Sequence, residues 1–563
     1  MKKTTTAFLI ACAAMSLTAC NVAFPIFSIT SYPSGSESSS RQQWNSNTSY
    51  SQASVEPMQS YSHPQPIPKK EGQTAMALNY GDLFKNNVYD LSAAPSSGNV
   101  NLLVIPIWFA DSSDYIAPTQ MEVIREDIRR SYFGTEEETG WHSVRTYYEN
   151  ESLGRLSLDG TVSEWYQANQ RSSAFYSEDA GATATENLAS NAVDWYFNTH
   201  EGADRKDFDS DGDGYLDGVM FIYGSPDYNQ LGRSSASNMW AYCYWLQDTK
   251  KQNVASPGLN AYFWASYDFM YSPLAARAQT LVSSYGGGDT SHCKIDAHTY
   301  IHEMGHVFGL EDYYDYGANQ YKPAAGFSMQ DANRGGHDPY SAIALGWADP
   351  YIPTESGTVT IGAFQKEHDV ILLTPSWNEN DSPFDEYLLL ELYTPTNLNA
   401  FDCAYAYDGV NKLKGPNATG IRVWHVDARL VECKDVRGNN PIYHASDIGT
   451  SVAKSQGSYG FTHAFSNSYA DLSYGSVLGN SYDDYDIIHL IRDNGAERLR
   501  TTDTLSGNDL FYAGSSFTMS FYYRQFAQGT KLNSGAALGW SFSITSITGQ
   551  GNDAQATISL TRA

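Results

Sequence analysis

The stretch His302-Glu303-Met304-Gly305-His306-Val307-Phe308-Gly309-Leu310-Glu311-Asp312 decides the chemistry and fold of the middle of this chain. Histidines four residues apart lie on one face of a helix, so His302 and His306 can hold one ion, and zinc prefers imidazole ligands. Glu303 lies about 100° around the helix from His302 and therefore beside the ion. This position suits a general base that takes a proton from water. The pattern predicts a hydrolytic zinc site.

The third zinc ligand is expected just after this helix. Gly309 can adopt the left-handed conformation that ends a helix and turns the chain back. Asp312, ten residues after the first histidine, can then bind the metal, and a fourth position stays open for water. Glu311 and Asp315 are close in sequence and remain alternatives for this ligand. Two histidines that merely decorate a solvated helix are the other interpretation, but the glycine and aspartate at fixed offsets argue against it.

The surrounding pattern favours a metzincin-like arrangement over its main competitor. Apolar residues at helical spacing predict a helix over Ile295–Phe308. About twenty residues later, Gly326–Asp331 is an apolar turn whose Met329 could lie beneath the metal. A gluzincin arrangement needs a glutamate on a following helix, yet the next glutamate after Glu311 is Glu355.

The chain resembles the immune inhibitor A-like family of secreted bacterial zinc metallopeptidases. The resemblance rests on His302–Asp312 and the aromatic run Tyr313–Tyr316, the Met329 turn, His337–Pro339, Leu345–Trp347, Leu102–Asp111, Ser143–Leu156, Glu386–Glu391 and Trp424–Asp427. It covers roughly residues 100 to 430. It implies a zinc endopeptidase that acts on proteins.

Composition divides the chain into four parts. Residues 1–19 are expected to be a signal peptide and 20–75 a low-complexity tether, rich in Ser, Tyr, Pro, Gln and Asn. Residues 76–350 alternate aliphatic strands with helical patterns and predict an α/β catalytic domain. Residues 351–563 predict an all-β, sandwich-like region. Its expected strands are Thr358–Ile361, Val370–Thr374, Tyr387–Tyr393, Ile421–Val426, Phe517–Tyr523, Trp540–Ile547 and Ala554–Leu560.

The N-terminus suggests export and anchoring. Lys2 and Lys3 precede an apolar run that ends in Leu17-Thr18-Ala19-Cys20, which resembles a bacterial lipobox. Cleavage before Cys20 would leave a lipidated cysteine that holds the protein on a membrane, facing outward. An ordinary signal peptide with an incidental cysteine is the alternative. The formal net charge of −28 gives no electrostatic footprint for nucleic acid.

The other cysteines suggest two bridges. An exported protein can keep disulfides, and pairing of nearest neighbours would join Cys243 to Cys293 and Cys403 to Cys433. Free buried thiols are the alternative.

A second cation site is predicted in the run Asp209-Ser210-Asp211-Gly212-Asp213-Gly214-Tyr215-Leu216-Asp217. Oxygen ligands at this spacing suit calcium, with Asp209, Asp211 and Asp213 at positions one, three and five, the Tyr215 carbonyl at seven and Asp217 at nine. Met220 stands at position twelve, where an EF-hand has glutamate, so a weak structural site is expected. An acidic turn that binds nothing is the alternative.

The sequence therefore predicts a lipid-anchored zinc endopeptidase whose partners are protein or peptide substrates. A surface-binding, adhesive lipoprotein with a structural zinc site is one rival. The other is a zinc hydrolase of cell-wall peptide amides.

Overall fold

The structure is a computed structural model of the whole chain. It describes residues 92–228, 230–232, 238–246, 251–272, 275, 292–314, 322–375, 386–406, 414–428, 430–433, 442–444, 460–463, 486–495, 497–500, 503 and 505–563. The predicted signal peptide, tether and Cys20 lie outside these residues.

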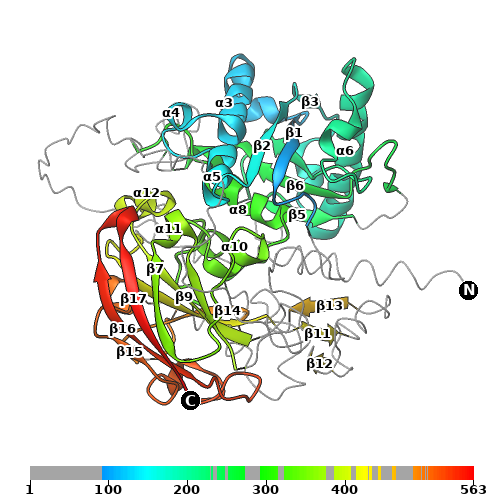
Figure 1. The fold of residues 1–563 in the computed structure, drawn as a ribbon. Coiled ribbons are helices and arrows are strands. Elements are labelled where there is room, and N and C mark those ends of the chain that lie inside the picture. Colours follow the sequence, from blue (N-terminus) through cyan, green and yellow to red (C-terminus); the bar gives the residue numbers. More distant parts are fainter. Residues whose placement is uncertain are drawn as a thin grey trace, which may run out of the picture.

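The first half is a mixed α/β domain built on a six-stranded sheet (Figure 1). The strand order is β2-β1-β4-β6-β5, with β3 also paired to β1. All pairs are parallel except the antiparallel pair of β5 with β6. The strands are β1 (Gly98–Trp108), β2 (Leu156–Val162), β3 (Tyr166–Gln167), β4 (Val219–Tyr223), β5 (Tyr242–Trp245) and β6 (Ala261–Ser266).

Helices cover both faces of this sheet (Figure 1). On β1, Leu102 and Val104 face one hydrophobic core, while Leu103 and Ile105 face another. A parallel strand buried on both faces needs a continuous apolar run, and Leu102–Ile107 supplies it. The first core includes residues of α3 (Met121–Phe133), α5 (Val144–Glu151) and α8 (His298–Val307), and the second includes residues of α6 (Glu178–Thr199). Short helices α4 (Glu136–Thr139), α9 (Met329–Ala332) and α10 (Pro339–Ala344) complete the domain.

The second half is a β-sandwich. One four-stranded antiparallel sheet has the order β14-β10-β9-β8, and the other has the order β15-β16-β17-β7. A third core lies between them and takes side chains from both, such as Leu390 and Phe542. The elements are β7 (Gly357–Gly362), α11 (Phe364–Glu367), β8 (Val370–Leu373), β9 (Glu386–Tyr393), α12 (Leu398–Ala404), β10 (Gly420–Asp427), β14 (Ile488–Ile491), β15 (Ser516–Phe517), β16 (Trp540–Thr548) and β17 (Gln555–Arg562), with a small sheet of β11 (Leu430–Cys433), β12 (Ile442–His444) and β13 (Gly460–His463).

The predicted fold class is confirmed: a mixed α/β domain is followed by antiparallel sheets. One predicted strand is wrong in extent. β15 covers only Ser516–Phe517, because the chain then turns, with the Phe521 and Tyr522 N–H groups donating to the Thr518 carbonyl at 3.0 and 3.2 Å.

The two halves share one core. The sheet β14-β10-β9-β8 is buried on both faces, because Leu389 and Trp424 belong to the same core as Met304 of α8. Arg422 of β10 pairs with Glu391 of β9 at 2.8 Å and donates to the carbonyl of Phe327 at 3.2 Å. The predicted boundary near residue 350 therefore crosses a continuous hydrophobic core.

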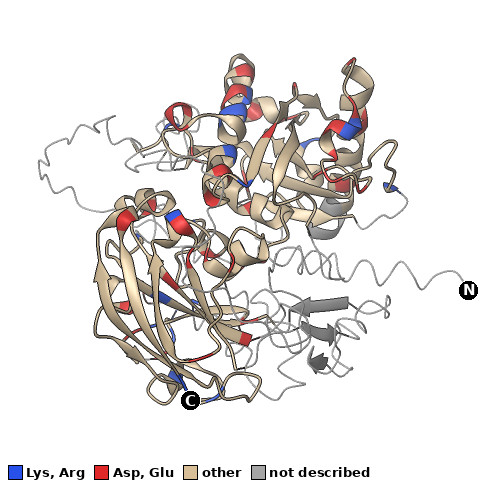
Figure 2. Cartoon of the chain, in the orientation of Figure 1, with Lys and Arg blue, Asp and Glu red and all other residues tan. Residues whose placement is uncertain are grey.

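Charged side chains lie on both halves (Figure 2). Arginines gather on α3, where each has an acidic partner. Arg125 pairs with Glu122 at 2.8 Å, and Arg129 pairs with Glu126 at 2.9 Å and Glu138 at 2.8 Å. These acids offset the positive charge of the helix. Among the described residues, no helix is long and apolar enough to cross a bilayer.

Candidate active site

Helix α8 positions the two predicted imidazole ligands. Its first N–H groups need acceptors, and the N–H of His298 donates to Asp296 Oδ1 at 2.9 Å. Its last turn ends as predicted at Gly309, which has φ +96°. The N–H of Leu310 donates to the carbonyl of Gly305 at 3.0 Å, so the chain reverses over the end of the helix. This reversal brings Asp312 back toward the helix.

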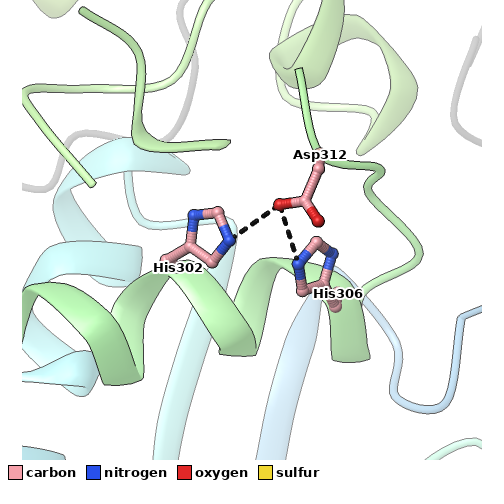
Figure 3. A group of neighbouring side chains, drawn as sticks. All are labelled: His302, His306 and Asp312. Carbon is pink, nitrogen blue, oxygen red and sulfur yellow. Dashed lines mark ion pairs between the residues drawn. The ribbon is translucent and has the colours of Figure 1, made fainter. Parts of the chain in front are cut away.

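His302, His306 and Asp312 converge on one point (Figure 3). The Nε2 atoms of His302 and His306 lie 2.9 and 3.3 Å from Asp312 Oδ1. One ligand atom from each residue lies within 4.8 Å of the others. Asp312 is the carboxylate of this group, and the alternative Glu311 is not part of it. The other alternative, Asp315, lies outside the described residues. The structure thus brings together the three residues predicted to bind zinc.

Backbone carbonyls fix both imidazole rings. His302 Nδ1 is 2.7 Å from the carbonyl oxygen of Met329, and His306 Nδ1 is 2.7 Å from that of Leu310. A carbonyl can only accept, so each Nδ1 carries a proton and each Nε2 is left to face Asp312. Carbonyl partners of this kind orient the rings of metal-ligating histidines. The Met329 turn therefore contacts this group through its backbone carbonyl.

Burial and charge fit a cation at this point. The side chains of His302 and Asp312 are about one-twentieth exposed, and that of His306 is 13% exposed. Burial alone would raise the pKa of Asp312, but His306 and His302 hold it well below its usual range. Burial would lower the pKa of His306, but Asp312 raises it to about 10. A carboxylate that attracts positive charge this strongly suits a divalent ion.

Glu303 lies beside this group, as predicted. It is buried, and its Oε2 atom makes no hydrogen bond to any described residue. Burial raises the pKa of Glu303, while His306 and His302 oppose the shift. A buried carboxylate oxygen without a protein donor is available to a water molecule or a substrate.

The predicted calcium loop is partly assembled. The carboxylates of Asp209, Asp211 and Asp213 lie together. Asp209 Oδ2 accepts the N–H of Gly214 at 3.1 Å, while its buried Oδ1 has no hydrogen-bond partner among the described residues. Asp217 instead accepts the N–H of Ser210 at 2.7 Å, and burial raises the pKa of Asp217 to about 7.

The cysteine prediction is wrong for the described residues. No disulfide involves Cys243, Cys293 or Cys403, and the side chain of Cys433 is not described. Cys243 Sγ donates instead to the carbonyl of Glu303 at 3.1 Å. Cys403 Sγ lies 3.0 Å from the hydroxyl of Tyr393. Cys293 is buried in the first core. Cys243 and Cys293 are buried outside any disulfide, as in the alternative that the sequence left open, while Cys403 is only partly buried.

Sequence reasoning missed a buried ion cluster at the start of α8. His298 Nδ1 lies 2.6 Å from Asp296 Oδ1, and its Nε2 lies 3.3 Å from Asp402 Oδ2. The spacing of His298 four residues before His302 was the only sequence signal. Asp402 carried none, because α12 lies far away in the sequence.

One family model matches this part of the chain. Residues 100–331 match the catalytic domain of the immune inhibitor A peptidase M6 family. They form an M6 peptidase catalytic domain. The M6 domain contains the three converging side chains, Glu303 and the Met329 turn. An M6 catalytic domain implies a metallopeptidase, and M6 peptidases depend on zinc. The predicted family resemblance is thus confirmed for this region. No curated protein matches the chain significantly.

Proposed function

We propose that this protein is a zinc-dependent endopeptidase that hydrolyses peptide bonds of extracellular proteins. The observation that carries the proposal is the convergence of His302, His306 and Asp312 in an M6 domain, with both imidazole Nε2 atoms turned toward one carboxylate oxygen. These three side chains would hold the zinc ion. When bound, zinc lowers the pKa of a water molecule and polarises a carbonyl group.

Glu303 would move the proton. Its Oε2 atom accepts a proton from the attacking water and later donates it to the leaving amine. The raised pKa of Glu303 supports the first step, because a carboxylate whose acid has a higher pKa is a stronger base toward the attacking water. The carbonyls of Met329 and Leu310 keep the imidazoles in place during this exchange.

The test compares the purified parent with Glu303→Gln on casein and gelatin. This substitution keeps the side-chain shape, so zinc should stay bound while kcat falls by roughly 10²- to 10⁴-fold. A zinc chelator should abolish activity of the parent, and added zinc should restore it. A cell-wall peptide substrate run in parallel addresses the amide-hydrolase rival. If parent and Glu303→Gln leave every protein substrate intact, the endopeptidase proposal is refuted.

We also propose the calcium site and the anchored location. Asp209, Asp211 and Asp213 would bind calcium, with the Tyr215 carbonyl and Asp217 completing the loop. The unpartnered Asp209 Oδ1 supports this assignment. Residues 1–19 would be removed and Cys20 lipidated, which would place the M6 domain (within 76–350) and the β-region (351–563) outside the cell on a tether of residues 20–75. An adhesive role of the β-region remains the alternative.

A further inference from the structure

A buried ion cluster connects the β-region to the start of the metal-binding helix. His298 is the first residue of α8. Its Nδ1 lies 2.6 Å from Asp296 of the same segment, and its Nε2 lies 3.3 Å from Asp402 of α12. The three side chains are at most 1% exposed. The ring also stacks on Trp141, with centroids 3.7 Å apart and planes 7° apart.

The two carboxylates make His298 a cation. A carboxylate faces each ring nitrogen, so both nitrogens act as donors. Burial alone would lower the pKa of His298, but Asp296 and Asp402 raise it to about 9. The positively charged His298 ring has a carboxylate on each side, so it cannot rotate without leaving one buried carboxylate unpaired.

Asp402 also holds the loop that carries the Met329 turn. Its Oδ2 atom accepts the N–H of Gly335 at 2.7 Å. Six residues earlier, at the start of α9, the Met329 carbonyl accepts from His302 Nδ1. One carboxylate of the β-region therefore contacts both the beginning of α8 and the loop that orients the first predicted zinc ligand.

We propose that His298 and Asp402 are positioning residues for the zinc site, through which the β-region fixes α8 against the Met329 turn. This inference rests on the proposed peptidase function. Neither residue belongs to the group of side chains proposed to hold the metal. They act through His302, whose ring direction depends on the relative placement of the helix and the turn. Misplacement of a reacting group by about 1 Å can cost 10²-fold in rate.

The experiment uses the full chain and four variants: His298→Ala, Asp402→Ala, their double variant and Asp402→Asn. We expect each alanine variant to lower kcat on a peptide substrate at least tenfold, with KM within about twofold of the parent. Zinc should also be lost more readily to a competing chelator. The double variant should lose no more of its kcat than the less active of the two single variants, because the residues act as a unit. Asp402→Asn keeps an acceptor for Gly335 and should show a smaller loss, which covers the case in which an alanine variant fails to fold.

Asn399→Ala is the matched control. Asn399 is on α12 too, and its Oδ1 accepts the N–H of the neighbouring Gly336 at 3.0 Å. It therefore binds the same loop, while its Nδ2 donates to the carbonyl of Thr394 at 3.0 Å and not to α8. We expect its melting temperature to fall while kcat stays within twofold.

Three results would overturn the inference. They are an unchanged kcat and zinc affinity in the folded Asp402 variants, additive losses in the double variant, or an equal loss of kcat in Asn399→Ala. An inactive parent would instead refute the proposed peptidase. The chelator competition, followed by the visible spectrum of the cobalt-substituted site, would still decide the positioning role.

Discussion

Calcium should stabilise this protein by an amount that the ligand set bounds. The predicted loop offers Asp209, Asp211 and Asp213, without a bidentate glutamate at position twelve. Such sites in extracellular modules have dissociation constants of about 10⁻⁴ to 10⁻³ M. At 10 mM calcium, the free energy of unfolding should therefore rise by about 1.4 to 2.7 kcal/mol. For a domain of this size, that corresponds to a rise of about 3 to 10 °C in melting temperature.

The assay is thermal unfolding in chelator, in 10 mM calcium and in 10 mM magnesium. Asp209→Asn is the matched variant, because an amide oxygen can still accept the N–H of Gly214 that Asp209 Oδ2 accepts at 3.1 Å. Its buried, unpartnered Oδ1 is replaced by a neutral group. We expect the calcium-dependent rise in melting temperature to disappear in this variant. In chelator, the parent and the variant should melt at similar temperatures. Equal melting of the parent in calcium and magnesium would refute the site.

Further predictions concern packing, pH and anchoring. Gly305→Ala should lower the free energy of unfolding by about 1–3 kcal/mol in urea denaturation, because its Cβ would clash with the carboxamide of the fully buried Gln330 side chain; no change would contradict this close approach. Tyr148→Phe should cost about 1 kcal/mol in the same assay, since its hydroxyl donates to the Ile301 carbonyl at 2.7 Å. The pKa of His298 is raised from 6.5 to about 9, so its contribution to the free energy of unfolding is complete below pH 6.5 and is lost as pH rises through 9. In His298→Gln, the free energy of unfolding should decline less over this pH range. A parallel decline in both proteins would argue against the assignment. Cys20→Ala should release the protein from the membrane fraction, and retention would exclude lipidation as the anchor.

The convergence of His302, His306 and Asp312 was predictable because its geometry is local. His302, Glu303 and His306 share one helix, and Gly309 needs only its own conformational freedom to turn the chain toward Asp312. The strand at Leu102 and the sandwich strands were readable from apolar runs and alternation. These sequence patterns depend on only a few neighbouring residues, and the structure contains the elements that they predict.

The rest depends on contacts between distant segments. Asp402 reaches His298 across 104 residues, and no local pattern marks an aspartate on a short helix as the partner of a histidine. The cysteine pairing failed for the same reason, because sequence distance says nothing about where Cys243 and Cys293 point. The turn after Phe517 also escaped, since its aromatic residues have high strand propensity while Thr518 closes a turn.

The carbonyls of Met329 and Leu310 have a consequence for the loss and return of a bound metal ion. Because they hold both imidazole rings in a single orientation, the arrival of a cation requires no rotamer search and little ordering entropy. If a competing chelator removed zinc, the ligand side chains would keep their arrangement and could bind the ion again when it returns. Loss of the metal would then stop activity reversibly and would not be the first step of unfolding.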